Sequence, residues 1–159
     1  MTGLNKMFDE FNSTYGIEKK PLTHKLDSML SLIKDEVFEL EEEIYDDDFN
    51  FVLENPNKGN IVKEALDTVY IAIQQLRERG VDVDKGLAEL HRSNMSKKID
   101  IYDGESAIKE LEIARERYPE AQLIPHSDKY VLKDAATGKV IKPTCYSEAN
   151  MTKGIIGSK

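Results

Sequence analysis

Two segments decide the fold of this chain: KDEVFEL at residues 34–40 and KEALDTVY at residues 63–70. Each segment holds two acidic residues three positions apart, Glu36 and Glu39 in the first, Glu64 and Asp67 in the second. On an α-helix, positions i and i+3 lie on the same face, so each pair can present two carboxylates in one direction. Two such helices packed antiparallel would bring four carboxylates to one point. We therefore expect a site for a hard cation such as Mg²⁺ or Mn²⁺.

Each acidic pair lies beside an apolar stripe with helical spacing. The first stripe consists of Leu26, Met29, Leu30, Ile33, Val37, Leu40 and Ile44, and the second of Val62, Ala65, Leu66, Val69, Tyr70, Ile73 and Leu76. Apolar residues with a period near 3.6 predict amphipathic helices. Carboxylates beside a core-facing stripe are costly to desolvate unless they are paired or bind a metal, so their position favours a functional role.

The remaining periodicity predicts a bundle of four to five helices. The expected helices cover residues 5–15, about 23–44, 60–80, from 82 or 84 through 95, and 106–118. The expected end signals are Thr23 as an N-cap, Gly80 as a C-terminal glycine, and Asp82 or Asp84 as an N-cap. Between the two long helices we expect a loop with a short helical turn near residues 51–53.

The period changes near the C-terminus. Apolar residues at 130–132 and 140–141 flank the turn-like Thr137-Gly138, which suggests a small β-hairpin. The polar tail after Pro143 is expected to be disordered in isolation. The predicted fold is therefore all-α, a helical bundle with a small C-terminal β-hairpin, and oligomeric.

Length and charge limit the function classes. A chain of 159 residues favours a single domain over 1–159, with its core at 23–98 and an inserted helix, hairpin and tail at 103–159. The chain has 22 basic and 30 acidic residues, a net charge of −8 and a pI near 5.0. This balance argues against duplex nucleic acid as a partner.

Cysteine usage and hydropathy indicate the compartment. The lone Cys145 excludes an intrachain disulfide and fits a reducing compartment. No apolar run reaches the length of a membrane span, and the first residues lack an apolar signal core. We expect a cytoplasmic protein with no membrane partner.

A third segment, HRSNMSKK at residues 91–98, concentrates hydrogen-bond donors and cations. Asn94 and Lys97 are three positions apart on the expected helix, so they could reach a phosphate together. The alternative is a helix C-terminus that carries the cations its dipole favours.

Together these segments resemble the MazG-like, all-α nucleotide pyrophosphohydrolase superfamily. Residues 34–40 resemble its E-E-x-x-E motif and residues 63–70 its E-x-x-D motif. The branch that resembles phosphoribosyl-ATP pyrophosphohydrolases is indicated by residues 80–82, residues 91–97, and residues 138–143 with Tyr146. The likeness covers residues 23–98 well and 128–146 loosely; the expected helix 106–118 looks like an insertion.

The resemblance implies Mg²⁺-dependent hydrolysis of a (deoxy)nucleoside triphosphate to the monophosphate and pyrophosphate, by attack of water at the α-phosphorus. Mn²⁺ is a possible substitute, and the implied assembly is a homodimer or a dimer of dimers. The implied metal ligands are Glu36, Glu39, Glu64 and Asp67. The implied catalytic residues are Asp35, Glu36 and Glu39, and the implied substrate-binding residues are Asn12, Arg92, Asn94, Lys97 and Lys98.

Asp35 departs from the family motif, which has Glu at this position. Asp35 or a ligand carboxylate would accept the proton of the attacking water. Lys97, with Arg92 or Lys98, would hold the leaving pyrophosphate, and Asn94 would orient the sugar or phosphate.

Two alternatives stay open from the sequence. One keeps the enzyme class and takes phosphoribosyl-ATP as the substrate. The other is a catalytically silent helical module that dimerises or caps a partner; the intact carboxylate pairs argue against it. No residue in the sequence indicates which base is recognised.

Overall fold

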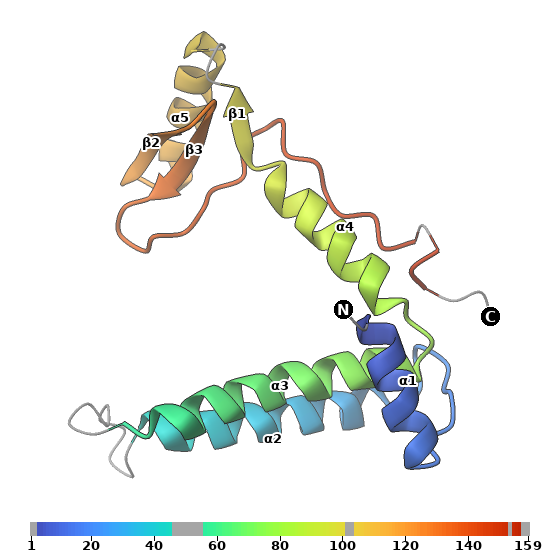
Figure 1. Cartoon of the computed structure of the whole chain (residues 1–159). Coiled ribbons are helices and arrows are strands. Elements are labelled where there is room, and N and C mark those ends of the chain that lie inside the picture. Colours follow the sequence, from blue (N-terminus) through green and yellow to red (C-terminus); the bar gives the residue numbers. More distant parts are fainter. Residues whose placement is uncertain (1–2, 46–55, 101–103, 153, 157–159) are drawn as a thin grey trace. The chain divides into compact units, whose positions relative to one another are not determined.

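A computed structural model describes residues 3–45, 56–100, 104–152 and 154–156 of the chain. Within these ranges it contains five helices and three strands (Figure 1). The helices are α1 (Leu4–Thr14), α2 (Leu26–Ile44), α3 (Lys58–Glu78), α4 (Val83–Met95) and α5 (Gly104–Arg117). The strands are β1 (Lys98–Asp100), β2 (Ala121–His126) and β3 (Lys129–Asp134). The mostly helical fold is confirmed. The expected turn near residues 51–53 and the acidic residues 46–48 lie outside the described ranges.

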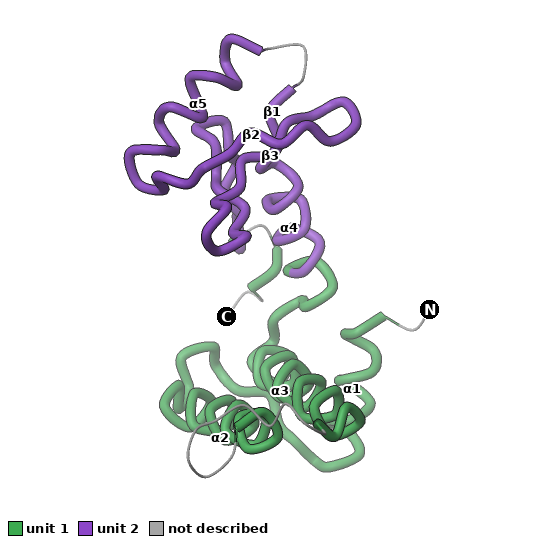
Figure 2. Tube along the Cα trace, turned by 90° about the vertical axis from the view of Figure 1, so that its left-hand side faces the viewer, with its two compact units in different colours: residues 1–86, 152–159 green, residues 87–151 purple. Residues whose placement is uncertain are grey.

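The chain divides into two compact units, residues 1–86 with 152–159, and residues 87–151 (Figure 2). The boundary falls within α4, so the acidic pairs belong to the first unit and residues 91–98 to the second. The single domain expected from the sequence stays a prediction.

In the first unit, α2 and α3 form an antiparallel pair packed side by side (Figure 1). Near the segment that connects them, Asn60 Nδ2 donates to Glu43 Oε1 at 3.0 Å. Helix α1 packs on α3 through Phe8, whose ring centroid lies 4.6 Å from that of Tyr70. This pair of long helices brings the two acidic motifs next to each other.

The start of α2 differs from the sequence prediction. The helix begins at Leu26, and its N-cap is Lys25, with φ of +44° and no side-chain cap. Thr23 lies in the preceding turn, where His24 N donates to Pro21 O at 2.9 Å. Arg79 Nη2 holds the same turn by donating to His24 O at 2.9 Å. Thr23 as the cap was therefore wrong, because a long-range contact from the end of α3 supports the turn.

The end of α3 agrees with its sequence signal. Helix α3 starts after Asn57, whose side chain accepts from Asn60 N at 3.2 Å, and it ends at Glu78. Gly80 follows with φ of +77°, a conformation that glycine adopts without a steric penalty. Val81 N donates to Leu76 O at 3.1 Å, which closes the helix end.

The two candidate caps of α4 have separate roles. Asp82 caps α4, because its Oδ1 accepts from Lys85 N at 3.1 Å. Asp84 instead accepts from Leu4 N at 3.0 Å and Asn5 N at 3.1 Å, at the N-terminus of α1. A Cβ at Gly3 would lie 2.9 Å from Asp84 Oδ2, so glycine permits this close approach. The two acids thus cap helices that are far apart in the sequence.

In the second unit, the strands form an antiparallel sheet in the order β1-β3-β2, and α5 packs on it. Its core consists of Ile99, Ala107, Ala114, Ala121, Leu132 and Ile141. The partner of β3 in the hairpin is β2, across a turn at Ser127 with φ of +55°. Val140 contributes an isolated bridge to Lys133. The predicted two-stranded hairpin is therefore replaced by a three-stranded sheet.

The tail after Pro143 follows α4 within the second unit. Tyr146 Oη and Ser93 Oγ lie 2.7 Å apart, and Arg92 Nη1 donates to Ser147 Oγ at 2.9 Å. Asn150 N donates to Glu89 Oε1 at 2.8 Å. These contacts order a segment that the sequence alone marked as polar tail. No described helix combines the length and apolarity needed to cross a bilayer.

Candidate functional site

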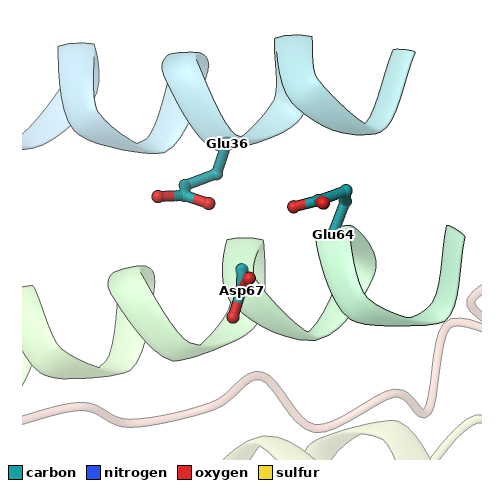
Figure 3. Close-up of side chains that lie close together, drawn as sticks. All are labelled: Glu36, Glu64 and Asp67. Carbon is teal, nitrogen blue, oxygen red and sulfur yellow. The ribbon is translucent and has the colours of Figure 1, made fainter. Parts of the chain in front are cut away.

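Three of the four paired acids converge between α2 and α3. Glu36 from α2 and Glu64 and Asp67 from α3 each offer one carboxylate oxygen, and these oxygens lie within 4.8 Å of one another (Figure 3). Glu36 and Glu64 extend into the space between the two helices. We call these three residues the acidic group. The antiparallel packing that the sequence predicted places them together.

The other predicted acids lie beside the acidic group. Glu39 is exposed and outside the group of three, although its charge contributes to the raised pKa of Glu36. Asp35 is also exposed and outside the group. Both side chains are therefore accessible from solvent in the single chain.

The electrostatics of the acidic group favour a bound cation. Burial raises the pKa of Glu36 above its ordinary value, and the carboxylates of Glu39, Asp67 and Glu64 raise it further. Crowded like charges are strained without a compensating positive charge. Carboxylate oxygens are the ligands that Mg²⁺ and Mn²⁺ prefer, so the donor set fits a hard divalent cation.

Lys63 lies against the acidic group, and the sequence reasoning missed it. Its Nζ is 2.9 Å from Glu64 Oε1, 3.0 Å from Glu64 Oε2 and 2.9 Å from Asp67 Oδ2. The hydrogen bonds to Asp67 and Glu64 raise the pKa of Lys63, and the bond to Asp67 has the largest effect. The spacing of Lys63 and Asp67, four positions apart on a helix, is the sequence signal that could have revealed this pair.

The second unit contains a cationic cluster around Tyr146. Lys97 Nζ donates to Asn94 Oδ1 at 2.7 Å. Helix α4 ends at Met95, so Lys97 lies beyond the helix on which the sequence placed it. Lys142 Nζ lies 4.4 Å from the centroid of the Tyr146 ring. The hydrogen bond between Ser93 and Tyr146 and the charges of Lys142 and Lys97 hold the pKa of Tyr146 below its ordinary value. Lys142 was not among the predicted site residues, because its tertiary position is set by the tail.

Arg92 and Lys98 have different surroundings. Arg92 donates to both carboxylate oxygens of Glu89 and to Ser147 Oγ and Glu148 O, so its guanidinium anchors the tail to α4. Lys98 is exposed and begins β1. Of the four predicted residues in this segment, Asn94 and Lys97 are the two that contact each other.

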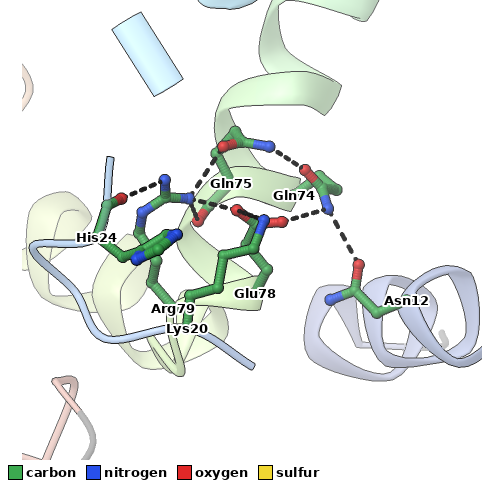
Figure 4. A network of polar contacts seen from close by, with 7 residues as sticks. All are labelled: Asn12, Lys20, His24, Gln74, Gln75, Glu78 and Arg79. Carbon is green, nitrogen blue, oxygen red and sulfur yellow. Dashed lines mark hydrogen bonds and ion pairs between the residues drawn. The ribbon is translucent and has the colours of Figure 1, made fainter. Parts of the chain in front are cut away.

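Asn12 belongs to a buried polar network at the end of α3 (Figure 4). Its Oδ1 accepts from Gln74 Nε2 at 3.1 Å, and Gln74 also donates to Glu78. Glu78 is 2% exposed and pairs with Arg79 at 2.6 Å and Lys20 at 3.2 Å. The network ties α1 and the segment before α2 to α3. The side-chain oxygen of Asn12 is thus engaged inside the protein.

The comparison with protein families agrees with this arrangement. The family model of phosphoribosyl-ATP pyrophosphohydrolase matches residues 3–94. The match covers more than half of the 159-residue chain and includes both acidic motifs and Asn94. No curated protein and no solved structure matches the chain. The protein therefore belongs to the phosphoribosyl-ATP pyrophosphohydrolase family, within the MazG-like pyrophosphohydrolase superfamily.

Proposed function

We propose that the protein hydrolyses a (deoxy)nucleoside triphosphate to the nucleoside monophosphate and pyrophosphate, with Mg²⁺ as its cofactor. The observation that supports this function is the acidic group on α2 and α3, in a chain that belongs to a family of pyrophosphohydrolases. Facing helices of a bundle are a common framework for carboxylate metal sites.

The acidic group would hold the cation, with Glu39 as the fourth ligand, because Glu39 lies one helical turn from Glu36. Mn²⁺ is a possible substitute, since the two ions share a preference for oxygen ligands. A cation bound here would neutralise charge on the triphosphate and lower the pKa of a water molecule.

The reaction breaks one phosphoanhydride bond. The oxygen of water bonds to the α-phosphorus, the bond from the α-phosphorus to the bridging oxygen breaks, and pyrophosphate leaves with the electron pair of that bond. The proton of water would pass either to Asp35, which is exposed next to Glu36, or to a carboxylate of the acidic group.

Lys97 would pair with the phosphates, because it has an ammonium group and lies within the cationic cluster around Tyr146. Asn94, in contact with Lys97, would orient the sugar or a phosphate. Lys98 is the second predicted phosphate ligand; Arg92 is the weaker candidate, since its donors hold Glu89 and the tail. Asn12 would face the nucleotide through its amide nitrogen, because its oxygen binds Gln74.

Phosphoribosyl-ATP is the second candidate substrate, and the family match specifically favours it. This molecule also contains a triphosphate, and the same α–β bond would be broken. Phosphoribosyl-ATP carries an additional phosphoribosyl group on its adenine base, which an ordinary nucleoside triphosphate lacks, so a direct comparison of substrates separates the two candidates.

We also propose that the protein works as a homodimer or a dimer of dimers. None of the residues of α2, all of which the structure describes, is buried within the single chain. Large apolar side chains are exposed on both long helices: Leu26, Leu30, Leu32, Val37, Phe38, Val62, Leu66 and Val69. Apolar surface of this extent is typical of an interface between protein chains. A second copy packed on these helices would bury it.

The test of the function is a substrate panel with Mg²⁺. Ribo- and deoxyribonucleoside triphosphates and phosphoribosyl-ATP are each incubated in ¹⁸O-labelled water, and the products are identified by mass spectrometry. We expect pyrophosphate without label and a monophosphate with one ¹⁸O atom, because water attacks the α-phosphorus. Label in pyrophosphate would contradict the proposed chemistry. No hydrolysis of any substrate would favour the silent helical module.

A further inference from the structure

The acidic group already contacts a positive charge from its own chain. We infer that Lys63 is an internal counter-ion of Glu64 and Asp67, and that a divalent cation binds the acidic group by displacing the Lys63 ammonium. The inference rests on the proposed function in one respect, namely that the acidic group binds a divalent cation.

The contacts of Lys63 are the same carboxylates that would hold the cation. Its Nζ contacts both oxygens of Glu64 and Oδ2 of Asp67, at 2.9 to 3.0 Å. Mg²⁺ lies about 2.1 Å from its oxygen ligands. A cation on one of these oxygens would thus be at most about 5 Å from the ammonium if Lys63 stayed in place. Two positive charges at this separation repel each other, so both cannot be held well.

Lys63 is free to leave because its side chain is mostly in solvent. The side chain is 61% exposed, whereas that of Glu64 is 11% exposed. The flexible four-carbon stem of lysine can rotate outward without moving α3. Glu64 stays in place, since it is packed between the helices. Replacement of the Lys63 ammonium by a divalent cation therefore requires movement of the Lys63 side chain alone.

This exchange has a consequence for the order of binding. The ion pairs with Lys63 stabilise the metal-free site, so they lower its affinity for a free cation. The displaced ammonium remains on the first turns of α3, close to the acidic group. When the cation binds together with a nucleotide, a phosphate oxygen can form an ion pair with the displaced ammonium of Lys63. The site thus favours a cation that is bound to phosphate over the free ion.

The test measures Mn²⁺ binding to the full chain by isothermal titration calorimetry, without substrate. Lys63→Gln should bind Mn²⁺ about five- to tenfold more tightly than the parent, because no ammonium competes. Lys63→Arg keeps the charge and should bind as the parent does or more weakly. Lys58→Gln removes the same charge from the first turn of α3 and should change the affinity by less than about twofold.

A second measurement separates displacement from a general charge effect. Without metal, Lys63→Gln should melt at a lower temperature than the parent, because the acidic group loses its counter-ion. With saturating Mn²⁺ the difference in Tm should disappear. Equal Mn²⁺ affinity in Lys63→Gln and Lys58→Gln would overturn the inference and leave the proposed function intact. No Mn²⁺ binding by either the parent or Lys63→Gln would overturn both, because the acidic group would then not bind a divalent cation even without the competing ammonium.

Discussion

Glu64 illustrates how a single residue links stability and function in this protein. It is 9% exposed, yet its carboxylate is kept beside an apolar stripe. A buried carboxylate is stable only when a positive charge or hydrogen-bond donors compensate it. Lys63 provides that charge within the chain, and the proposed cofactor would provide it in the active protein. The site therefore requires a positive charge to compensate the buried carboxylate of Glu64.

The first prediction concerns individual residues of the acidic group. Glu64→Gln and Asp67→Asn should each abolish hydrolysis and leave the far-ultraviolet circular dichroism spectrum unchanged, because a neutral amide is a poor ligand for Mg²⁺. Mg²⁺ should raise the Tm of the parent by mass action, and raise it less in either variant. Glu42→Gln, an exposed change on the same α2 helix, is the control. Parent-like rates in both variants would refute the assignment.

The second prediction concerns Lys97. If Lys97 holds phosphate, Lys97→Ala removes a charge-assisted contact and should lower kcat/KM by about 10- to 100-fold, with Tm nearly unchanged. If Lys97 only stabilises the end of α4, the same change should cost a few tenths of a kcal/mol and leave kinetics alone. Lys109→Ala on α5 is the control, since Lys109 pairs with the exposed Glu105 on the same helix. Parent-like kinetics of Lys97→Ala would mean that Lys97 has only a structural role.

At the scale of elements, the ends of the helices are held by residues from other elements. Asp84 lies at the N-terminus of α4 and caps α1, while Asn5 of α1 donates to Asp82 at 2.7 Å and accepts from Val83 N at 2.9 Å. A carboxylate at a helix N-terminus also interacts favourably with the helix dipole. The starts of α1 and α4 therefore stabilise each other.

The third prediction tests this mutual capping. Asp82→Ala should lower the free energy of unfolding by about 1 kcal/mol, within the usual range of roughly 0.5 to 2 kcal/mol for a lost N-cap. Lys85→Ala removes the ion pair to Asp82 and keeps the capped backbone N–H, so it should cost no more than about 0.5 kcal/mol. Urea denaturation measures both. Equal losses would mean that the ion pair, rather than the cap, stabilises α4.

The fourth prediction is the pH dependence of the same cap. The hydrogen bond from Asn5, together with those from Lys85, lowers the pKa of Asp82 from 3.8 to about 2. The folded state thus releases the proton more readily than the unfolded state, so the stabilisation is present above pH 3.8 and is lost as pH falls towards 2. Between these values the parent should lose more stability than Asp82→Asn, whose side chain does not titrate. Parallel stability curves for the two proteins would contradict the role of Asp82.

At the scale of the whole molecule, the single chain leaves its long helices incompletely covered. On α3, Val62, Leu66 and Val69 are each more than half exposed, and their spacing places them on one face. The buried residues of α3 are instead polar: Glu64, Gln74, Gln75 and Glu78. The interior of the helix pair is therefore polar, at the acidic group and in the network around Glu78, whereas its exposed face is apolar.

The fifth prediction is the oligomeric state. Sedimentation at micromolar concentration should show a dimer or tetramer and no monomer, because burial of the apolar face of α2 and α3 stabilises the assembly. Leu66→Lys should shift the protein towards the monomer, since a charge would be placed in the interface. Ile108→Lys, at a similarly exposed apolar residue on α5, is the control. A stable, active monomer would refute the prediction.

Several features of this protein were predictable from its sequence because they depend on local spacing. The apolar stripes predicted α2 and α3, the i, i+3 pairs predicted which acids share a face, and Gly80 predicted a helix end. The likeness of the motifs to a known superfamily agrees with the family match over residues 3–94. These signals are short-range: the apolar stripes repeat several times along each helix, and the acidic pairs and Gly80 act through their immediate neighbours in the chain.

The tertiary structure decided what depends on residues far apart in the chain. Strand β2 was missed because Pro125 interrupts its pattern, and an edge strand tolerates proline since its outer N–H groups need no partner. Thr23 lost its expected role because Arg79 holds the turn before α2. Asp82 rather than Asp84 caps α4, because Asp84 binds the N-terminus of α1. The position of Lys142 depends on the tail, in which Tyr146 contacts it. A cap, an edge strand or an ion pair is stable only with its partner in place, and only folding brings that partner near.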